Sequence, residues 1–155
     1  MISIANILPT IQADFPHINF MVGENFFWSP KDNKITYTSH QTDAAHGVWA
    51  LLHEVAHADL NHKHYLSDFE LLQLELKAWQ HAKTLGKKYH VEIEHNHIQD
   101  CLDTYRDWLH LRAKCPKCTV ISLQRPDNLY QCFNCKTTWQ VPKSPLCRVT
   151  RQIIS

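Results

Sequence analysis

The chain has 155 residues, of which 44% are hydrophobic and 20% are charged, and its formal net charge is +1. This length allows one main domain with a small appendage, and the composition argues against an intrinsically disordered chain. The nearly neutral charge indicates no nucleic-acid or membrane binding by the chain as a whole. No stretch approaches the roughly 20 apolar residues of a membrane span, and the N-terminus lacks a signal-peptide pattern, so we expect a soluble, cytoplasmic protein without a membrane partner.

Charge is divided unevenly along the chain. Residues 1–111 hold 8 Lys and Arg against 14 Asp and Glu, a balance of −6. Residues 112–155 hold 8 basic residues against Asp127 alone, a balance of +7. The change coincides with a shift from long helical periodicity to short strand-like pieces. We therefore predict a helical domain over residues 1–113, a small basic module over 114–141 and a tail over 142–155.

The N-terminal region is predicted to contain strands followed by helices. A short helix with a proline near its first turn is expected over residues 5–15. Alternating apolar residues predict short strands at 18–22, 25–28 and 34–38. Apolar stretches with helical periodicity predict three longer helices at 44–60, 67–85 and 97–113. This order favours an α+β fold with a small antiparallel sheet and three main helices.

The clearest chemical signal is the segment His53-Glu54-Val55-Ala56-His57. It lies within an apolar predicted helix, where positions 53 and 57 are one turn apart on the same face. Two neutral imidazoles at this spacing can bind one Zn²⁺. Glu54 is offset by about 100° from His53, so its carboxylate can accept a proton from a water that the metal activates. Because an apolar helix does not favour His and Glu without partners, we interpret the motif as a metal site.

A catalytic zinc site keeps three protein ligands, so a third ligand is expected. In one class of such sites it is a histidine six residues after the second ligand, but that position is Lys63 here. The following helix offers Glu70 and Glu75. Glu70 fits a capping box with Ser67, whereas Glu75 falls on the apolar stripe, where a lone carboxylate is costly to bury. We predict Glu75 as the third ligand, the alternative being a buried partner for Arg106 or a histidine.

The second signal is a pair of C-x-x-C motifs. Cys115 and Cys118 are followed, after 13 residues, by Cys132 and Cys135. Each motif points two sulfurs at one metal, and two of them on adjacent hairpins complete a tetrahedral Cys₄ site. The sequence shows no secreted context that would favour disulfides. We therefore predict a structural zinc ribbon, so the chain is expected to hold two zinc ions, one catalytic and one structural.

The His-Glu-Val-Ala-His segment at 53–57, followed by Glu75-Leu-Lys-Ala-Trp, resembles the gluzincin metallopeptidases. Over residues 18–90 the motifs are similar to those of the compact ImmA/IrrE-type and minimal gluzincin domains. A zincin domain followed by a zinc ribbon is also similar to the SprT-like proteins, although those usually use a third His in a Gly-His-Gly context that this chain lacks. The resemblance implies a zincin-like domain in which a metal-activated water attacks a peptide carbonyl, with Glu54 as general base and then proton donor.

The same resemblance implies how a substrate would be held. In such domains the substrate lies as an added strand along the sheet edge that precedes the active helix, here 35–38, which could equally be an ordinary hairpin strand. The donor that stabilises the oxyanion is not implied, and four residues are candidates: His62, His64, Tyr65 and Tyr105. Three further histidines, at 90, 95 and 97, are expected on the solvated surface.

The ribbon has three candidate roles. Its basic charge and the aromatic residues Tyr130, Phe133 and Trp139, which we expect to be exposed, would suit single-stranded nucleic acid. It could instead recruit a protein substrate or pack on the N-terminal domain.

The sequence thus predicts a gluzincin-type zinc metallopeptidase acting on a protein or peptide substrate. The alternative is a non-catalytic zinc-ribbon protein that binds protein or nucleic acid, with a structural or latent H-E-x-x-H site. In a latent peptidase, the tail over 142–155 or a partner would cover the cleft.

Overall fold

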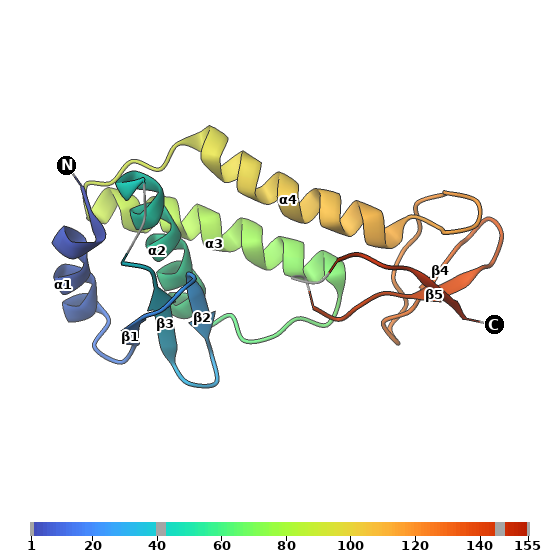
Figure 1. Ribbon diagram of the computed structural model, residues 1–155, viewed down its shortest axis with the longest axis horizontal. Coiled ribbons are helices and arrows are strands. Elements are labelled where there is room, and N and C mark those ends of the chain that lie inside the picture. The colour runs from blue at the N-terminus through green and yellow to red at the C-terminus, as the bar shows by residue number, and fades with distance from the viewer. Residues whose placement is uncertain (1, 40–42, 145–147, 155) are drawn as a thin grey trace. The chain divides into compact units, whose positions relative to one another are not determined.

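The computed structural model describes residues 2–39, 43–144 and 148–154 of the chain. The helices in this part of the chain are α1 (Ile4–Asp14), α2 (Ala44–Asp59), α3 (Asp68–Lys88) and α4 (His95–Ala113). The strands are β1 (Asn19–Val22), β2 (Phe27–Ser29), β3 (Lys34–Tyr37), β4 (Tyr130–Gln131), β5 (Thr138–Gln140) and β6 (Gln152–Ile154). The predicted α+β class is confirmed, with the short N-terminal helix as a fourth helix beside the three main ones (Figure 1).

The chain forms two compact units. The first comprises residues 1–64 and 74–98, and the second comprises residues 65–73 and 99–155. Helices α3 and α4 each contribute to both units, so the cysteine-rich segment shares its unit with parts of two helices. The predicted domain boundary after Ala113 stays a prediction. Within the described residues, no helix is both long and apolar enough to cross a membrane.

Helix α2 begins where the sequence turns apolar. Its N-cap is Asp43, whose carboxylate accepts hydrogen bonds from the N–H groups of Ala45 and His46. The apolar face of the helix is fully buried at Val48, Leu51, Leu52, Val55 and Ala56. This face packs against α1, β2 and β3 in the first unit (Figure 1). The packing fixes the rotation of α2 and therefore the direction in which its polar residues point.

The first sheet is mixed rather than antiparallel, in the order β1–β3–β2. β1 pairs with β3 in parallel, with Phe20 opposite Ile35, whereas β2 pairs with β3 in antiparallel, with Trp28 opposite Ile35. β3 is therefore the central strand. The expected docking edge at 35–38 is wrong, because both sides of β3 are already paired with neighbouring strands. The outer strands are β1 and β2.

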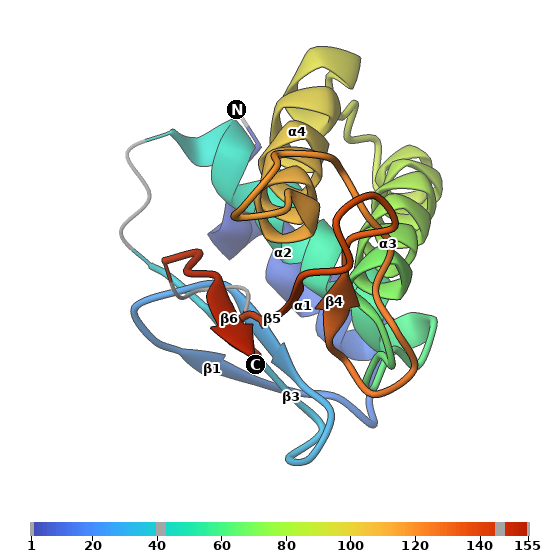
Figure 2. The ribbon, with the colours of Figure 1, turned by 90° about the vertical axis from the view of Figure 1, so that its right-hand side faces the viewer.

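In the second unit, β4, β5 and β6 form an antiparallel sheet (Figure 2). β6 comes from the predicted tail and pairs with β5. Tyr130 and Trp139 lie opposite each other, with stacked rings 5.6 Å apart, and are only 1% and 0% exposed. Their expected exposure is wrong, because so small a module needs its large aromatic rings to build a core. Phe133 is exposed, as predicted.

A buried ion pair joins Asp68 and Arg112 in the second unit. The Nε and Nη2 atoms of Arg112 lie 2.7 and 3.0 Å from the two carboxylate oxygens of Asp68. The hydroxyl of Tyr130 donates a further hydrogen bond to Asp68 at 2.6 Å, and the indole of Trp139 donates to the Arg112 carbonyl at 2.9 Å. The two buried aromatic residues of the ribbon are thus tied to the ends of α3 and α4.

Replacing Arg112 by Leu should lower the free energy of unfolding by about 3–5 kcal/mol, because Asp68 would remain buried without its cation. Arg106→Leu on the same helix is the matched control, since its exposed guanidinium pairs with Asp103 at 2.8 Å. That change should cost about 0–1 kcal/mol. Denaturant unfolding of the metal-loaded protein measures both losses. Equal losses would contradict a special role for the buried pair.

Candidate metal centres

Three side chains from two helices converge in the first unit. His53 and His57 lie one turn apart on α2, and Glu75 lies on α3. The Nε2 atoms of His53 and His57 are 3.0 and 3.1 Å from the two carboxylate oxygens of Glu75. The same two nitrogens are 3.1 Å apart. Ligand atoms bound to a tetrahedral zinc at about 2.1 Å lie about 3.4 Å from one another, so this group could hold one metal ion.

Glu75 is 6% exposed and faces the core, as the periodicity of its helix predicts. Burial alone would raise the pKa of its carboxyl, but hydrogen bonds with His53 and His57 lower that pKa to about 2. These hydrogen bonds therefore favour the ionised form of the Glu75 carboxylate in the interior. In turn, Glu75 raises the pKa of His57, although burial acts in the opposite direction. Arg106, the alternative partner considered for Glu75, pairs with Asp103 instead.

Glu70 has the capping role that distinguished it from Glu75. Its backbone N–H donates to the Ser67 hydroxyl at 3.1 Å, and its carboxylate accepts the N–H of Leu66 at 2.7 Å. These bonds satisfy amide groups at the start of α3 that have no partner within the helix. The predicted separation of the two glutamates into a cap and a core residue is confirmed.

Glu54 lies next to the cluster without joining the convergent ligand atoms. Its carboxylate accepts a hydrogen bond from the backbone N–H of Trp28, on β2, at 2.9 Å. Burial raises the pKa of this carboxyl, while the nearby His53 and His57 act to lower it. Glu54 thus lies beside the two imidazoles without being one of the converging groups, as its helical offset predicts, whereas its hydrogen bond with Trp28 was not predicted from the sequence.

His62 and Trp28 support the cluster from outside. The Nδ1 atoms of His62 and His57 lie 2.9 Å apart, so His62 contacts the nitrogen of His57 that does not face Glu75. The indole of Trp28 donates to the His62 carbonyl at 2.9 Å. Outer contacts of this kind orient metal-binding imidazoles. The short spacing of five residues between His57 and His62 is a sequence signal for the contact between their rings. Trp28 is distant in sequence from both histidines, so no such signal exists for its contact.

The other three candidates for the oxyanion donor are His64, Tyr65 and Tyr105. His64 is exposed. Tyr65 and Tyr105 belong to the second unit, so their role stays a prediction. His62 was itself a candidate; its Nδ1 faces the Nδ1 of His57, and its role as oxyanion donor stays a prediction.

The four predicted cysteine ligands converge in the second unit and could hold a metal ion. The sulfurs of Cys115 and Cys135 are 3.6 Å apart, and those of Cys118 and Cys132 are 3.4 Å apart. Sulfurs on a tetrahedral zinc, at about 2.3 Å from the metal, would lie about 3.8 Å apart. In each motif the first sulfur accepts the N–H of the second cysteine, at 3.5 and 3.4 Å.

The two cysteine turns share a backbone conformation. The residue after each turn, Thr119 in the first and Lys136 in the second, has a φ of 67° and 64° respectively. Burial opposes ionisation of Cys132, but the N–H groups of Cys135 and Asn134 and the Cys118 thiol lower its pKa to about 6. Backbone N–H groups aimed at sulfur favour the thiolate, which is the form that binds metal.

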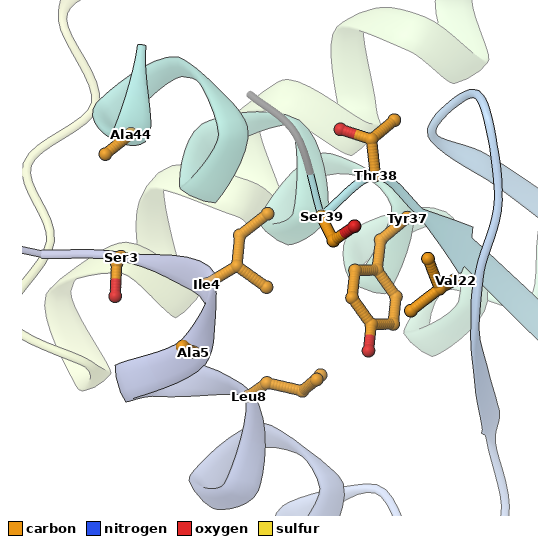
Figure 3. A pocket seen from close by; sticks show the side chains of 9 residues that line it. All are labelled: Ser3, Ile4, Ala5, Leu8, Val22, Tyr37, Thr38, Ser39 and Ala44. Atoms are coloured by element: carbon orange, nitrogen blue, oxygen red, sulfur yellow. The ribbon is translucent and has the colours of Figure 1, made fainter. Parts of the chain in front are cut away.

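A separate cavity of about 290 Å³ lies elsewhere in the first unit (Figure 3). It is lined by Ser3, Ile4, Ala5, Leu8, Val22, Tyr37, Thr38, Ser39 and Ala44. Figure 3 shows the side chains of Ile4, Leu8 and Tyr37 turned toward the same space, which is mostly apolar. Its lining does not include the ligand cluster, so the cavity and the metal centre are distinct features.

Comparisons of the chain with protein-family models, with curated proteins and with solved structures find no match. The two ligand groups, one of His and Glu and one of four Cys, are therefore the features from which a function can be inferred.

The wild-type protein is expected to bind two metal ions per chain, and Glu75→Ala should bind one, because two imidazoles alone make an incomplete site. Glu70→Ala is the matched control on the same helix and should keep both ions. Elemental analysis of protein purified without chelators measures the content. One ion in the wild type, or two in Glu75→Ala, would contradict the predicted ligand set.

His62→Phe should weaken metal binding at the His and Glu cluster by about 10–100-fold, because His57 would lose the partner that orients its ring. His64→Phe replaces an exposed histidine two residues away and should leave the affinity unchanged. Competition against a chromophoric chelator measures both dissociation constants. An unchanged affinity in His62→Phe would show that the contact between the two rings is incidental.

Proposed function

We propose that the chain is a zinc-dependent peptidase of gluzincin type, with His53, His57 and Glu75 as zinc ligands and Glu54 as general base. The supporting observation is that two imidazoles and a buried carboxylate converge on one point, beside a second carboxylate that is not a ligand. Three protein ligands leave one coordination position open, which is typical of catalytic zinc sites. A bound zinc ion would lower the pKa of a water molecule to about 7 and polarise a substrate carbonyl.

Glu54 has the properties that a general base requires. Burial raises the pKa of its carboxyl, which strengthens it as a proton acceptor. The Trp28 N–H holds one carboxylate oxygen, which leaves the other to take a proton from the attacking water. The same oxygen can then deliver this proton to the leaving amine.

We infer that a peptide substrate lies along the outer edge of β2 instead of along 35–38. β2 is an outer strand, and the N–H of its Trp28 is directed to Glu54. A peptide added to this edge would run beside the general base. The zincin-like assignment of the fold rests on this combination of a strand edge, a helix with two imidazoles and a glutamate on the next helix.

The four cysteines are proposed to hold a structural zinc, because a Cys₄ set leaves no open position. For the ribbon, we favour recruitment of a protein substrate over binding of single-stranded nucleic acid. Tyr130 and Trp139 are buried, so they cannot stack on bases. Leu123 and Phe133 are 87% and 68% exposed, and such apolar side chains suit contact with protein.

Glu54→Gln should keep both metal ions and lose peptide hydrolysis by about 10²–10⁴-fold, because the amide cannot accept the proton. Glu24→Gln, at an exposed position, is the control and should cleave as wild type does. Mass spectrometry of a mixture of unfolded peptides measures cleavage. Activity that survives in Glu54→Gln would contradict the assigned base. Wild-type protein that holds two zinc ions and cleaves no peptide would favour the non-catalytic alternative.

A further inference from the structure

The two histidines of the candidate centre are supported in different ways. His57 has His62 against its Nδ1, at 2.9 Å. The Nδ1 of His53 is buried, and among the described residues it has no hydrogen-bond partner. A metal-binding histidine almost always donates its second ring N–H to an acceptor that fixes the ring. His53 therefore needs another means of orientation.

The face of the His53 ring stacks on the indole of Trp79, while the His57 ring meets the His53 ring edge to face at 4.5 Å. The His53 and Trp79 ring centroids are 4.1 Å apart, and the ring planes are inclined by only 23°, so the rings are stacked. Both side chains are buried, with exposures of 8% for His53 and 4% for Trp79. Trp79 lies four residues after Glu75 on α3, so both residues occupy one face of that helix. Helix α3 thus presents a carboxylate to the edge of the imidazole and a flat ring to its face.

Trp79 is itself held by further rings. His97 meets it edge to face, with centroids 5.6 Å apart and planes inclined by 81°. His97 in turn packs on Trp49, at 4.8 Å, and stacks on His46, also at 4.8 Å. The expected position of His97 on the solvated surface is therefore wrong: it is half-buried within a cluster of rings. This cluster limits the movement of the indole.

We propose that Trp79 is a positioning residue that keeps His53 in its metal-facing orientation, in place of the usual second hydrogen bond. The proposal rests on the zinc site of the proposed function. A stacked indole opposes rotation of the imidazole, because rotation would break the contact between the ring faces. An imidazole bound to a divalent cation also carries partial positive charge, which the negative face of an indole attracts. The stacking therefore favours the metal-bound form.

Cobalt(II) titration of the full chain tests this role. Cobalt at the cysteine site gives thiolate-to-metal charge-transfer absorption together with ligand-field bands, whereas cobalt at the His and Glu site gives ligand-field bands without charge transfer. Each equivalent of cobalt is therefore assigned to a site by whether the charge-transfer absorption rises with it. Trp79→Leu should weaken cobalt binding at the His and Glu site by about 10–100-fold and alter its ligand-field bands. Trp79→Phe, which retains a ring, should recover most of the affinity.

Trp108→Leu is the matched control. Trp108 is a buried tryptophan of the second unit, 8% exposed, and its ring lies 4.4 Å from the Arg112 guanidinium. This variant should bind cobalt at the His and Glu site as tightly as the wild type. If Trp108→Leu weakens that binding as much as Trp79→Leu does, a general loss of packing explains the effect and the positioning role is overturned.

The outcomes separate this proposal from the proposed function. Wild-type protein that binds only one equivalent of cobalt, with charge-transfer absorption rising throughout the titration, would remove the His and Glu metal site itself. If the wild type binds cobalt at this site and Trp79→Leu has the same affinity and spectrum, the role of Trp79 is overturned and the metal site remains supported.

A second measurement applies if Trp79→Leu does not fold. In the wild type, a stacked indole shifts the carbon-bound ring protons of His53 upfield relative to those of His57 in proton NMR. Trp79→Phe should reduce this shift and the cobalt affinity together. Absence of the upfield shift in the metal-loaded wild type would overturn the proposal.

Discussion

The buried carboxylate of Glu75 is the constraint on which the candidate centre depends. It lies in an apolar interior with a second acidic group, Glu54, close to the same two imidazoles. If both imidazoles are neutral, two carboxylates share this region without a compensating charge. Such an arrangement is unfavourable in a low-dielectric interior unless a cation is bound. Protonation of His57, whose pKa Glu75 raises, would supply one positive charge, and a divalent ion between His53, His57 and Glu75 would supply two, which is the physical reason to propose such an ion.

The second unit also contains a buried carboxylate that needs a compensating positive charge. Asp68, also on α3, is buried, and the guanidinium of Arg112 neutralises it. The four convergent cysteines form a site for which thiolates and a metal are the stable combination. Each unit therefore contains a buried carboxylate from α3 that a nearby positive charge can neutralise. In one unit the cation is a side chain, and in the other we propose that it is zinc.

The support around the proposed zinc ligands is unequal, and this inequality has a structural origin. His57 is near the end of α2, where the chain turns and returns His62 to its ring. His53 is one turn earlier and buried, where the face of Trp79 contacts its ring and where none of the described residues offers its Nδ1 a hydrogen-bond acceptor. Trp28 also supports the site, because its backbone N–H donates to the Glu54 carboxylate and its indole donates to the His62 carbonyl.

The sequence by itself predicted the features that depend on local geometry. Helical periodicity places His53 and His57 on one face and separates Glu75 from Glu70, because the residues concerned lie within a few turns of one helix. Within each C-x-x-C turn, the spacing brings two sulfurs together, and the occurrence of two such turns predicted that they meet at one metal. Apart from that meeting of the two turns, each of these features is determined by spacing along a single element.

Only the tertiary structure decided the features that join distant residues. The pairing of β3 with both β1 and β2 placed it at the centre of the sheet, because an alternating pattern marks a strand without naming its neighbours. The burial of Tyr130 and Trp139 depends on a hairpin that brings them together. The contacts of Trp28 with Glu54 and of Trp79 with His53 link different elements, so spacing along the chain carries no signal for them.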